Sequence, residues 1–213
     1  MQTVAVVDYG MSNLRSVAKA LEAAAAGSAR VVISGEPDHL RAAERVVFPG
    51  QGAIGRCLST LDEHGLTSVL RECLRGKPYL GICLGMQCLL DRSAEDGGTA
   101  TLGIVPGEVR RFPDGRPDAG GRRCKVPHMG WNEVRQARVH PLWRGIDDGA
   151  RFYFVHSYYA DPAEARDLAG STDYIVPFAS AIARDNLFAV QFHPEKSQRN
   201  GLALLRNFLD WKP

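Results

Sequence analysis

The sequence predicts an α/β fold, in which a mostly parallel central sheet is flanked by helices and an additional antiparallel strand region lies in the second half. The first 90 residues alternate short apolar segments with helical patterns, which is typical of parallel strands joined by helices. The earliest segment is Val-rich and apolar throughout, as expected of a strand buried on both faces. The second half holds several strand-like runs separated by loops.

In the first half, strands and helices can be placed from the spacing of apolar residues. The first expected strand covers residues 3–8 and ends at Asp8-Tyr9-Gly10. In the helix that follows, Leu14, Val17 and Leu21 recur at helical spacing, and Gly27 ends it. Further strands are expected over 30–33, 45–48 and 77–82, and further helices from Pro37, across 58–74 with a break near Gly65, and over 84–91.

The second half reads as strands, loops and one closing helix. Strand-like runs cover 104–112, 124–134, 151–156, 174–182 and 187–192, and the Gly-, Pro- and charge-rich stretches 93–101 and 113–123 are expected to be loops. Residues 201–211 carry leucines and a phenylalanine at helical spacing. No linker divides the 213 residues, so a prior of about 150 residues per domain predicts a single domain, 1–213.

Composition narrows the classes of function. The 26 basic and 24 acidic residues leave a net charge of +2, which gives no electrostatic case for binding nucleic acid or an anionic membrane. The longest apolar run, near 79–86, is far shorter than the ~18 residues of a membrane span, and no basic segment precedes the N-terminal apolar stretch. Five irregularly spaced cysteines without a C-x-x-C pair predict free thiols and no zinc site. We therefore expect a cytoplasmic protein.

The sharpest local signal is Gly81-Ile82-Cys83-Leu84-Gly85, which follows an apolar strand and precedes a helix. This is the spacing of a nucleophile elbow, a tight turn that needs small residues two positions before and after the nucleophile. The helix N-terminus favours a thiolate at Cys83, and the backbone N–H of Leu84 would point to where an oxyanion forms. The alternative is a structural cysteine buried in an apolar strand, which is the more common role of a cysteine.

A nucleophilic cysteine needs a base, and His193 is the best candidate. It follows the apolar strand that ends at Phe192, and Pro194 stops that strand. Glu195 is close enough in sequence to orient the imidazole ring. A second strand end, Pro49-Gly50-Gln51-Gly52, would lie on the same rim as Cys83, because ligands bind outside the carboxyl ends of strands in α/β sheets. The alternatives are a surface histidine and an ordinary turn.

Taken together, these motifs resemble the class I, or triad, glutamine amidotransferases, a family with a flavodoxin-like α/β fold. The resemblance rests on G-I-C-L-G-M-Q at 81–87 and F-H-P-E-K-S at 192–197, and it covers nearly the whole chain. Three further stretches are similar to the glutaminase subunits of imidazole glycerol phosphate synthases: D-Y-G-M-S-N-L-R-S-V at 8–17, V-P-H-M-G-W-N at 126–132 and Y-F-V-H-S-Y-Y at 153–159.

The resemblance implies that Cys83 forms a glutamyl thioester, that His193 transfers the protons and that Glu195 orients the imidazole. It assigns no cofactor and no metal. Gln51 stands where an aliphatic residue is common in relatives, and Cys88 stands where Leu is common; we expect Cys88 to serve packing. The implied oxyanion donors are Gly50, Gln51, Gly52 and Leu84, and the implied glutamine-binding residues are Gln87, His156, Ser157 and Tyr158.

The resemblance also implies a heterodimer. Ammonia would pass to a separate (β/α)8-barrel cyclase subunit, where it would react with the ribulosyl-formimino-AICAR ribotide to give imidazole glycerol phosphate and AICAR in histidine biosynthesis. Asn13, Trp131 and Lys196 match positions associated with the subunit interface.

Three other functions remain open at this point. Glutaminase subunits of anthranilate, aminodeoxychorismate or pyridoxal phosphate synthase share the elbow and the triad, although the stretch P-H-M-G-W-N favours the histidine pathway. A cysteine peptidase of similar α/β design would need a peptide cleft, for which the sequence offers no signal. A non-catalytic interaction module is disfavoured because all three triad residues are present.

Overall fold

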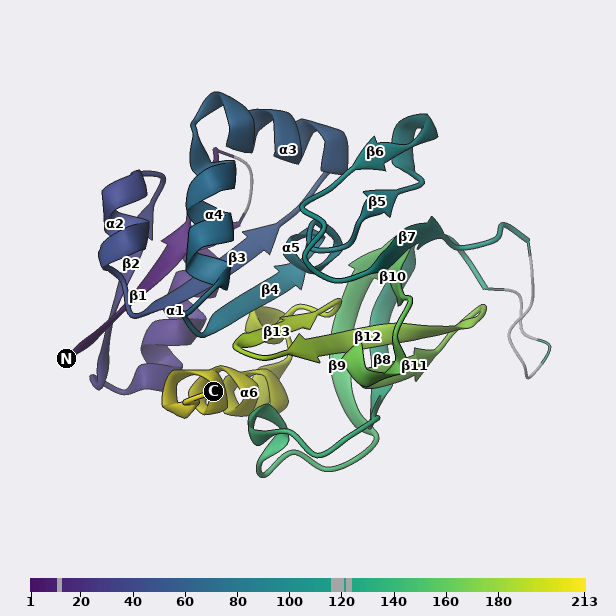
Figure 1. Ribbon diagram of the computed structural model, residues 1–213. Coiled ribbons are helices and arrows are strands. Elements are labelled where there is room, and N and C mark those ends of the chain that lie inside the picture. The colour runs from purple at the N-terminus through teal and green to yellow at the C-terminus, as the bar shows by residue number, and fades with distance from the viewer. Residues whose placement is uncertain (11–12, 116–120, 122–123) are drawn as a thin grey trace.

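The computed structural model describes residues 1–10, 13–115, 121 and 124–213, and within them a 13-stranded sheet runs through the molecule (Figure 1). Its first part is parallel, in the order β2-β1-β3-β4-β13. The strands are β1 (Gln2–Val7), β2 (Ala29–Ser34), β3 (Arg45–Gly50), β4 (Tyr79–Cys83) and β13 (Leu187–Val190). Successive residues of β1 alternate between two cores, Val4 and Val6 in one and Ala5 and Val7 in the other.

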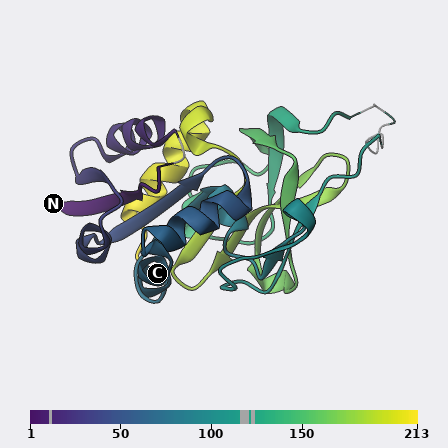
Figure 2. The same cartoon turned by 90° about the horizontal axis from the view of Figure 1, so that it is seen from above.

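Helices cover both faces of this parallel part. Figure 2 shows α1 (Leu14–Ala25) and α6 (Gln198–Asp210) on one side, and α3 (Ile54–Glu63) and α4 (Leu66–Leu74) on the other. The short helix α2 (Pro37–Ala42) packs with α4, and Leu40 joins the same core as α3 and α4. Gly65 has a φ of 66° between α3 and α4, which places the expected break at that residue.

The second half extends the sheet with mostly antiparallel pairings. Next to β13 the order is β12-β10-β7-β5-β6, and β11, β8 and β9 branch from β12. These strands are β5 (Arg92–Ser93), β6 (Thr99–Ala100), β7 (Gly107–Arg111), β8 (His128–Gln136), β9 (Ala150–His156), β10 (Tyr158–Pro162), β11 (Leu168–Asp173) and β12 (Pro177–Arg184). The short helical turns are α5 (Leu84–Gln87), η1 (Glu95–Gly97), η2 (Pro141–Trp143), η3 (Ala165–Asp167) and η4 (Pro194–Lys196).

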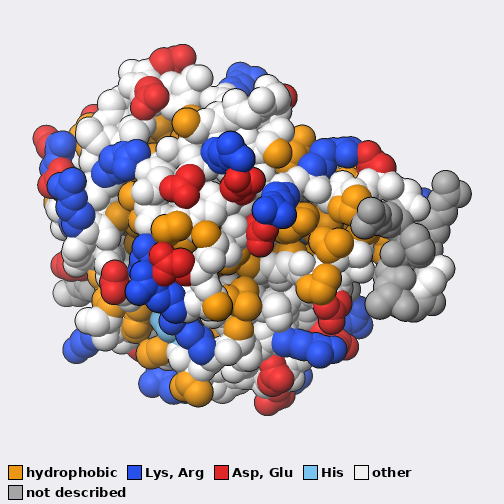
Figure 3. All heavy atoms as spheres, turned by 45° about the vertical axis from the view of Figure 1, so that its right-hand side comes forward, with side chains coloured by type: hydrophobic (Ala, Val, Ile, Leu, Met, Phe, Trp, Pro, Cys, Tyr) orange, Lys and Arg blue, Asp and Glu red, His pale blue; other side chains and the backbone are white. Residues whose placement is uncertain are grey.

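The predicted fold class is confirmed, whereas several element boundaries differ from those predicted. The helix expected over 84–91 ends at Gln87, because the carbonyls of Cys88, Leu89 and Leu90 instead accept backbone hydrogen bonds from residues 102–105. The strand expected from 124 begins at His128, and β10 and β11 were not predicted. Part of the loop expected over 113–123 lies outside the described residues. On the face in Figure 3, acidic and basic side chains are interspersed, in keeping with the small net charge.

Candidate active site

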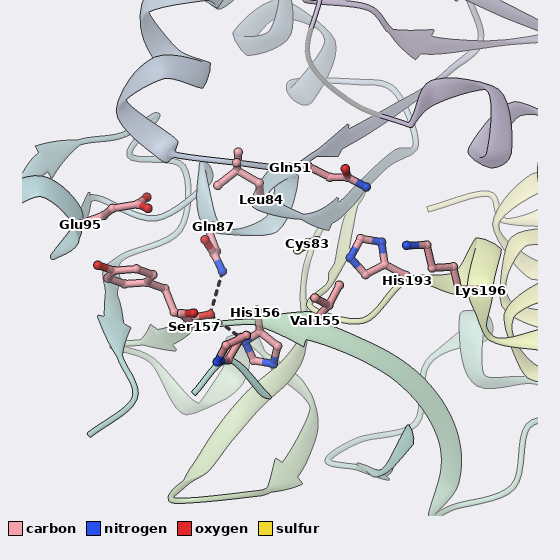
Figure 4. Close-up of a pocket in the computed structure, with 13 residues that line it drawn as sticks. Gln51, Cys83, Leu84, Gln87, Glu95, Val155, His156, Ser157, His193 and Lys196 are labelled. Carbon is pink, nitrogen blue, oxygen red and sulfur yellow. Dashed lines mark hydrogen bonds between the residues drawn. The ribbon is translucent and has the colours of Figure 1, made fainter. Parts of the chain in front are cut away.

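One pocket of about 440 Å³ lies at the carboxyl ends of the parallel strands, and Figure 4 shows the side chains that line it. Strands β3 and β4 deliver the 51–52 turn and Cys83 to this rim, and β13 leads to His193. Cys83 lies between Gln87 and His193 (Figure 4). Most of the residues that the sequence singled out line it: Gln51, Gly52, Cys83, Leu84, Gln87, His156, Ser157, Tyr158, His193 and Lys196.

Cys83 occupies a strained turn between β4 and α5. Its φ of 54° and ψ of −110° are uncommon for a residue with a side chain, at a typical cost of about 1–3 kcal/mol. A Cβ on Gly85 would lie 1.9 Å from the carbonyl oxygen of Phe48, and a Cβ on Gly81 would lie 2.9 Å from the carbonyl oxygen of Gly85. Both flanking glycines are therefore required sterically, which is the physical basis of the elbow motif.

His193 and Glu195 form a buried pair beside this turn. The ring Nδ1 of His193 lies 2.8 Å from Oε1 of Glu195, and the two side chains are 3% and 1% exposed. This bond leaves Nε2 as the ring nitrogen for the thiol, and Nε2 is buried without a hydrogen-bond partner among the described residues. Burial by itself lowers the pKa of His193, but interactions with Cys83 and Glu195 outweigh it and raise the pKa to about 10. The site therefore favours an imidazolium.

The 50–52 turn packs against the elbow. A Cβ on Gly50 would lie 2.8 Å from Cβ of Leu84 and 2.9 Å from Oη of Tyr9, so this glycine permits a close approach of β3 to α5. Gly52 has a φ of 88°, which favours glycine, and Gln51 is exposed at the rim. Gln51 and Gly52 of this turn and Leu84, the first residue of α5, line the pocket together with Cys83.

Opposite this turn, the residues from 155 to 158 form the other wall. His156 is buried, its Nδ1 lies 2.8 Å from the carbonyl oxygen of Tyr158, and its Nε2 lies 2.9 Å from Nδ1 of His128. Burial is the largest cause that lowers the pKa of His156 to about 3, and burial lowers the pKa of His128 to about 4, so both rings are neutral near pH 7. Ser157, which lies between His156 and Tyr158 in the sequence, also lines the pocket.

The sequence reasoning missed two residues at this site. Gln191 is fully buried at the end of β13, and its Nε2 lies 3.5 Å from Sγ of Cys83. Glu95 lines the pocket at the end opposite His193 (Figure 4), and its Oε2 accepts a 2.8 Å hydrogen bond from the backbone N–H of Ile54. Gln191 could have been found from sequence, because it is a polar residue in the otherwise apolar run 187–192.

The three expected interface residues surround the same end of the molecule. Trp131 is 39% exposed on β8, and its ring meets the Tyr153 ring edge-on at 6.2 Å. Lys196 is exposed, with Nζ 5.8 Å from the centre of the Tyr153 ring. Asn13 is exposed at the start of α1, where its Oδ1 accepts a hydrogen bond from Ser16 Oγ. All three side chains are therefore exposed, and Lys196 also lines the pocket.

A family model described as glutamine amidotransferase class-I matches residues 5–211, almost the whole chain. The chain belongs to the class-I glutamine amidotransferase family. The predicted resemblance is thus confirmed, and with it the glutamine amidotransferase activity that defines the family.

Curated relatives narrow the position of this glutamine amidotransferase within the family. It is 54% identical to the imidazole glycerol phosphate synthase subunit HisH of Dechloromonas aromatica over 213 residues, which cover 100% of the chain and 98% of the relative. The HisH subunit of Nitrosococcus oceani is 56% identical over 211 residues, 99% of the chain and 98% of the relative. Similarity of this extent includes the chain among the HisH subunits.

Solved structures share the fold at lower identity. A crystal structure of a glutamine amidotransferase superposes with a TM-score of 0.72 at 16% identity, covering 97% of each chain. A glutamine amidotransferase from Thermotoga maritima gives 0.69 at 15% identity, covering 98% of this chain and 96% of that one. At such identities the match supports the fold alone.

All five cysteines are free thiols, and Sγ of Cys57 and Sγ of Cys88 lie 3.9 Å apart in the core beneath the elbow. Residues 1–10, 13–115, 121 and 124–213 contain no group of three or more His, Cys, Asp or Glu side chains arranged to hold a metal ion. Over the same residues, no helix is long and apolar enough to cross a membrane.

Proposed function

We propose that the chain is the glutaminase subunit of an imidazole glycerol phosphate synthase and that Cys83 is its nucleophile. The Cys83 thiolate attacks the side-chain amide carbon of glutamine, and the C–N bond breaks as His193 gives its proton to the departing ammonia. Water, deprotonated by His193, then hydrolyses the glutamyl thioester and regenerates the thiolate. The observation that carries this proposal is the buried His193–Glu195 pair beside a cysteine held at a strained strand-to-helix turn.

The other pocket residues have roles that follow from their chemistry. Backbone N–H groups of Leu84 and of the turn Gly50-Gln51-Gly52 stabilise the oxyanion of each tetrahedral intermediate. The Glu95 carboxylate is suited to the α-ammonium group of glutamine, at the end of the pocket opposite His193. Gln87, His156, Ser157 and Tyr158 form the wall along which the substrate lies.

Ammonia passes from this pocket to a separate (β/α)8-barrel cyclase subunit in a heterodimer. The exposed side chains of Asn13, Trp131 and Lys196 contribute to the contact between the subunits. The support for this partner is the full-length similarity to HisH subunits, together with an exposed aromatic and cationic surface next to the pocket. Co-purification with either this cyclase or another synthase separates the histidine-pathway function from that of the other stand-alone glutaminases.

Covalent labelling tests the assignment of Cys83. An electrophilic glutamine analogue, followed by peptide mass spectrometry, should modify Cys83 before the other thiols. Three of those, Cys57, Cys73 and Cys88, are fully buried, and Cys124 lies outside the pocket. Preferential labelling of Cys88 or Cys124 would mean that the elbow is misplaced. Hydrolysis of peptides in preference to glutamine would favour a peptidase instead.

A further inference from the structure

Gln191 connects the nucleophile to the opposite wall of the pocket. It is the first residue after β13, its side chain is fully buried, and its backbone N–H donates to the carbonyl oxygen of Ser180 at 2.9 Å. Its amide makes two contacts of different character. Nε2 lies 3.5 Å from Sγ of Cys83, and Oε1 lies 3.0 Å from Nε2 of Gln87.

The orientation of this amide is determined by its neighbours. The carbonyl oxygen of Tyr158 can only accept hydrogen bonds, and Nε2 of Gln87 lies 2.9 Å from it, so the amide nitrogen of Gln87 must face Tyr158. The second N–H of Gln87 then donates to Gln191, which must present its oxygen there. The Gln191 amide nitrogen is thereby directed at the sulfur of Cys83, and exchanging its two ends would bring two donors together at Gln87.

The carbonyl oxygen of Tyr158 also accepts a hydrogen bond from the buried ring of His156. Nδ1 of His156 lies 2.8 Å from the oxygen of Tyr158, so it carries the proton and Nε2 of His156 is an acceptor. Nδ1 of His128 donates to that Nε2 at 2.9 Å, and Nδ2 of Asn132 donates to Nε2 of His128 at 3.2 Å. Every bond in this row has one donor and one acceptor, which keeps the amide of Gln191 from flipping.

We propose that Gln191 is a further catalytic residue, which donates an Nε2–H hydrogen bond to the sulfur of Cys83 and stabilises its thiolate. The proposal rests on the proposed function of Cys83 as nucleophile. A hydrogen bond to a charged group is roughly twice as strong as one between neutral groups, so this donor favours the thiolate over the thiol. Gln191 contacts Cys83 and His193 lines the same pocket, while Phe192 between them packs in the core.

The test compares two substitutions at Gln191 by the rate at which iodoacetamide alkylates Cys83, followed by peptide mass spectrometry from about pH 5 to pH 9. Gln191→Leu removes the donor, and the midpoint of the rate profile should move up by about one pH unit. Gln191→Glu keeps an acceptor for Gln87 but places a carboxylate against the sulfur, so its midpoint should rise at least as far. With glutamine as substrate, kcat should fall about tenfold or more in both variants.

If Gln191 served only in packing, the midpoints of the alkylation profiles would be different from those expected above. If Gln191 served only to hold Gln87, the midpoint in Gln191→Leu would stay at the wild-type value, and that result would overturn the proposal. Asn207→Leu is the matched control, because it removes another buried amide, one that donates to the carbonyls of Leu142 and Arg144. Its alkylation profile should match the wild type. Should Gln191→Leu fail to fold, Gln191→Met replaces it, because methionine keeps the length of the side chain but has no N–H to donate.

This experiment tests the donor role of Gln191 separately from the role of Cys83 as the nucleophile. Alkylation of Cys83 needs neither glutamine nor the cyclase subunit, so the midpoint is measured even where the enzymatic assignment is wrong. Normal glutaminase turnover in Cys83→Ala would overturn the nucleophile, whereas unmoved midpoints in the Gln191 variants would overturn only the donor.

Discussion

Replacing Gly50 by alanine should disable the oxyanion site while leaving the pocket able to bind glutamine. The added methyl group would lie 2.8 Å from Cβ of Leu84, 2.9 Å from Oη of Tyr9 and 3.2 Å from the backbone nitrogen of Gly85. Leu84 and Tyr9 are both buried, so neither has space to retreat. The strand end must therefore move away from the elbow, and the N–H groups of the 50–52 turn move with it.

The size of the effect follows from two separate terms. Forcing an extra carbon into a packed core costs about 1–3 kcal/mol, which should appear as a lower free energy of unfolding. Loss of one oxyanion donor costs about 100- to 1,000-fold in kcat, because the donor acts in the transition state. We therefore expect Gly50→Ala to lower kcat for glutamine roughly 100-fold, with KM changed by less than about threefold.

The assay is steady-state glutamate production by the complex with the cyclase subunit and its nucleotide ligand. Gly76→Ala is the control, since a Cβ there meets nothing within 4 Å and the residue has no positive φ. Synthesis from added ammonium salts should be unaffected in both variants. The reasoning is refuted if Gly50→Ala turns glutamine over as fast as Gly76→Ala.

Three further predictions concern coupling, a remote ion pair and pH. The isolated chain should hydrolyse glutamine slowly, and the cyclase subunit with its ligand should raise kcat at least about tenfold, which corresponds to some 1.4 kcal/mol of barrier. Equal kcat values with and without the cyclase subunit and its ligand would exclude activation by the partner. Asp167→Asn should lower the free energy of unfolding by about 2–4 kcal/mol, because its buried carboxylate accepts two hydrogen bonds from Arg184, at 2.8 and 2.6 Å. Since neither residue lines the pocket, kcat should not change, and chemical denaturation that shows an unchanged stability would contradict this prediction. Burial lowers the pKa of His128 to about 4 and is the largest cause that lowers the pKa of His156 to about 3. At these two rings the folded state therefore binds fewer protons than the unfolded state below pH 6.5, and the free energy of unfolding should fall by about 1–2 kcal/mol for each ring between pH 7 and pH 5. Equal denaturation midpoints at the two pH values would contradict this prediction.

The parallel half of the fold was predictable because most of its inner strands, such as β3, β4 and β13, are buried on both faces. Such a strand is a run of apolar residues, as in the second half of β1. The glycines on both sides of Cys83 predict a tight turn, because a side chain at either position would collide with the backbone. The same logic brought Cys83, the 50–52 turn and His193 to one rim, where the structure places them. That placement follows from the parallel sheet, whose strand ends share an edge.

The antiparallel half was less predictable for a related reason. Strand β11 reads L-A-G-S-T-D, and its conformation depends on pairing with β12, which follows it in the chain, and with β8, which lies far away in the sequence. The contact between Gln191 and Cys83 likewise joins residues 108 positions apart, and only the packing of β13 beside β4 creates it. Helix α5 ends earlier than predicted because residues 102–105 donate hydrogen bonds to the carbonyl groups of residues 88–90, and no local sequence pattern predicts that contact.

The most direct test of the account is the pair of rates for Cys83→Ala in the reconstituted complex with the cyclase subunit. The account predicts that synthesis of imidazole glycerol phosphate from glutamine is abolished, because the thioester cannot form. We also expect synthesis from added ammonium salts to stay within about twofold of the wild type, since in the proposed heterodimer the acceptor site lies on the cyclase subunit. Glutamine-dependent synthesis that survives in Cys83→Ala would contradict the account at its centre.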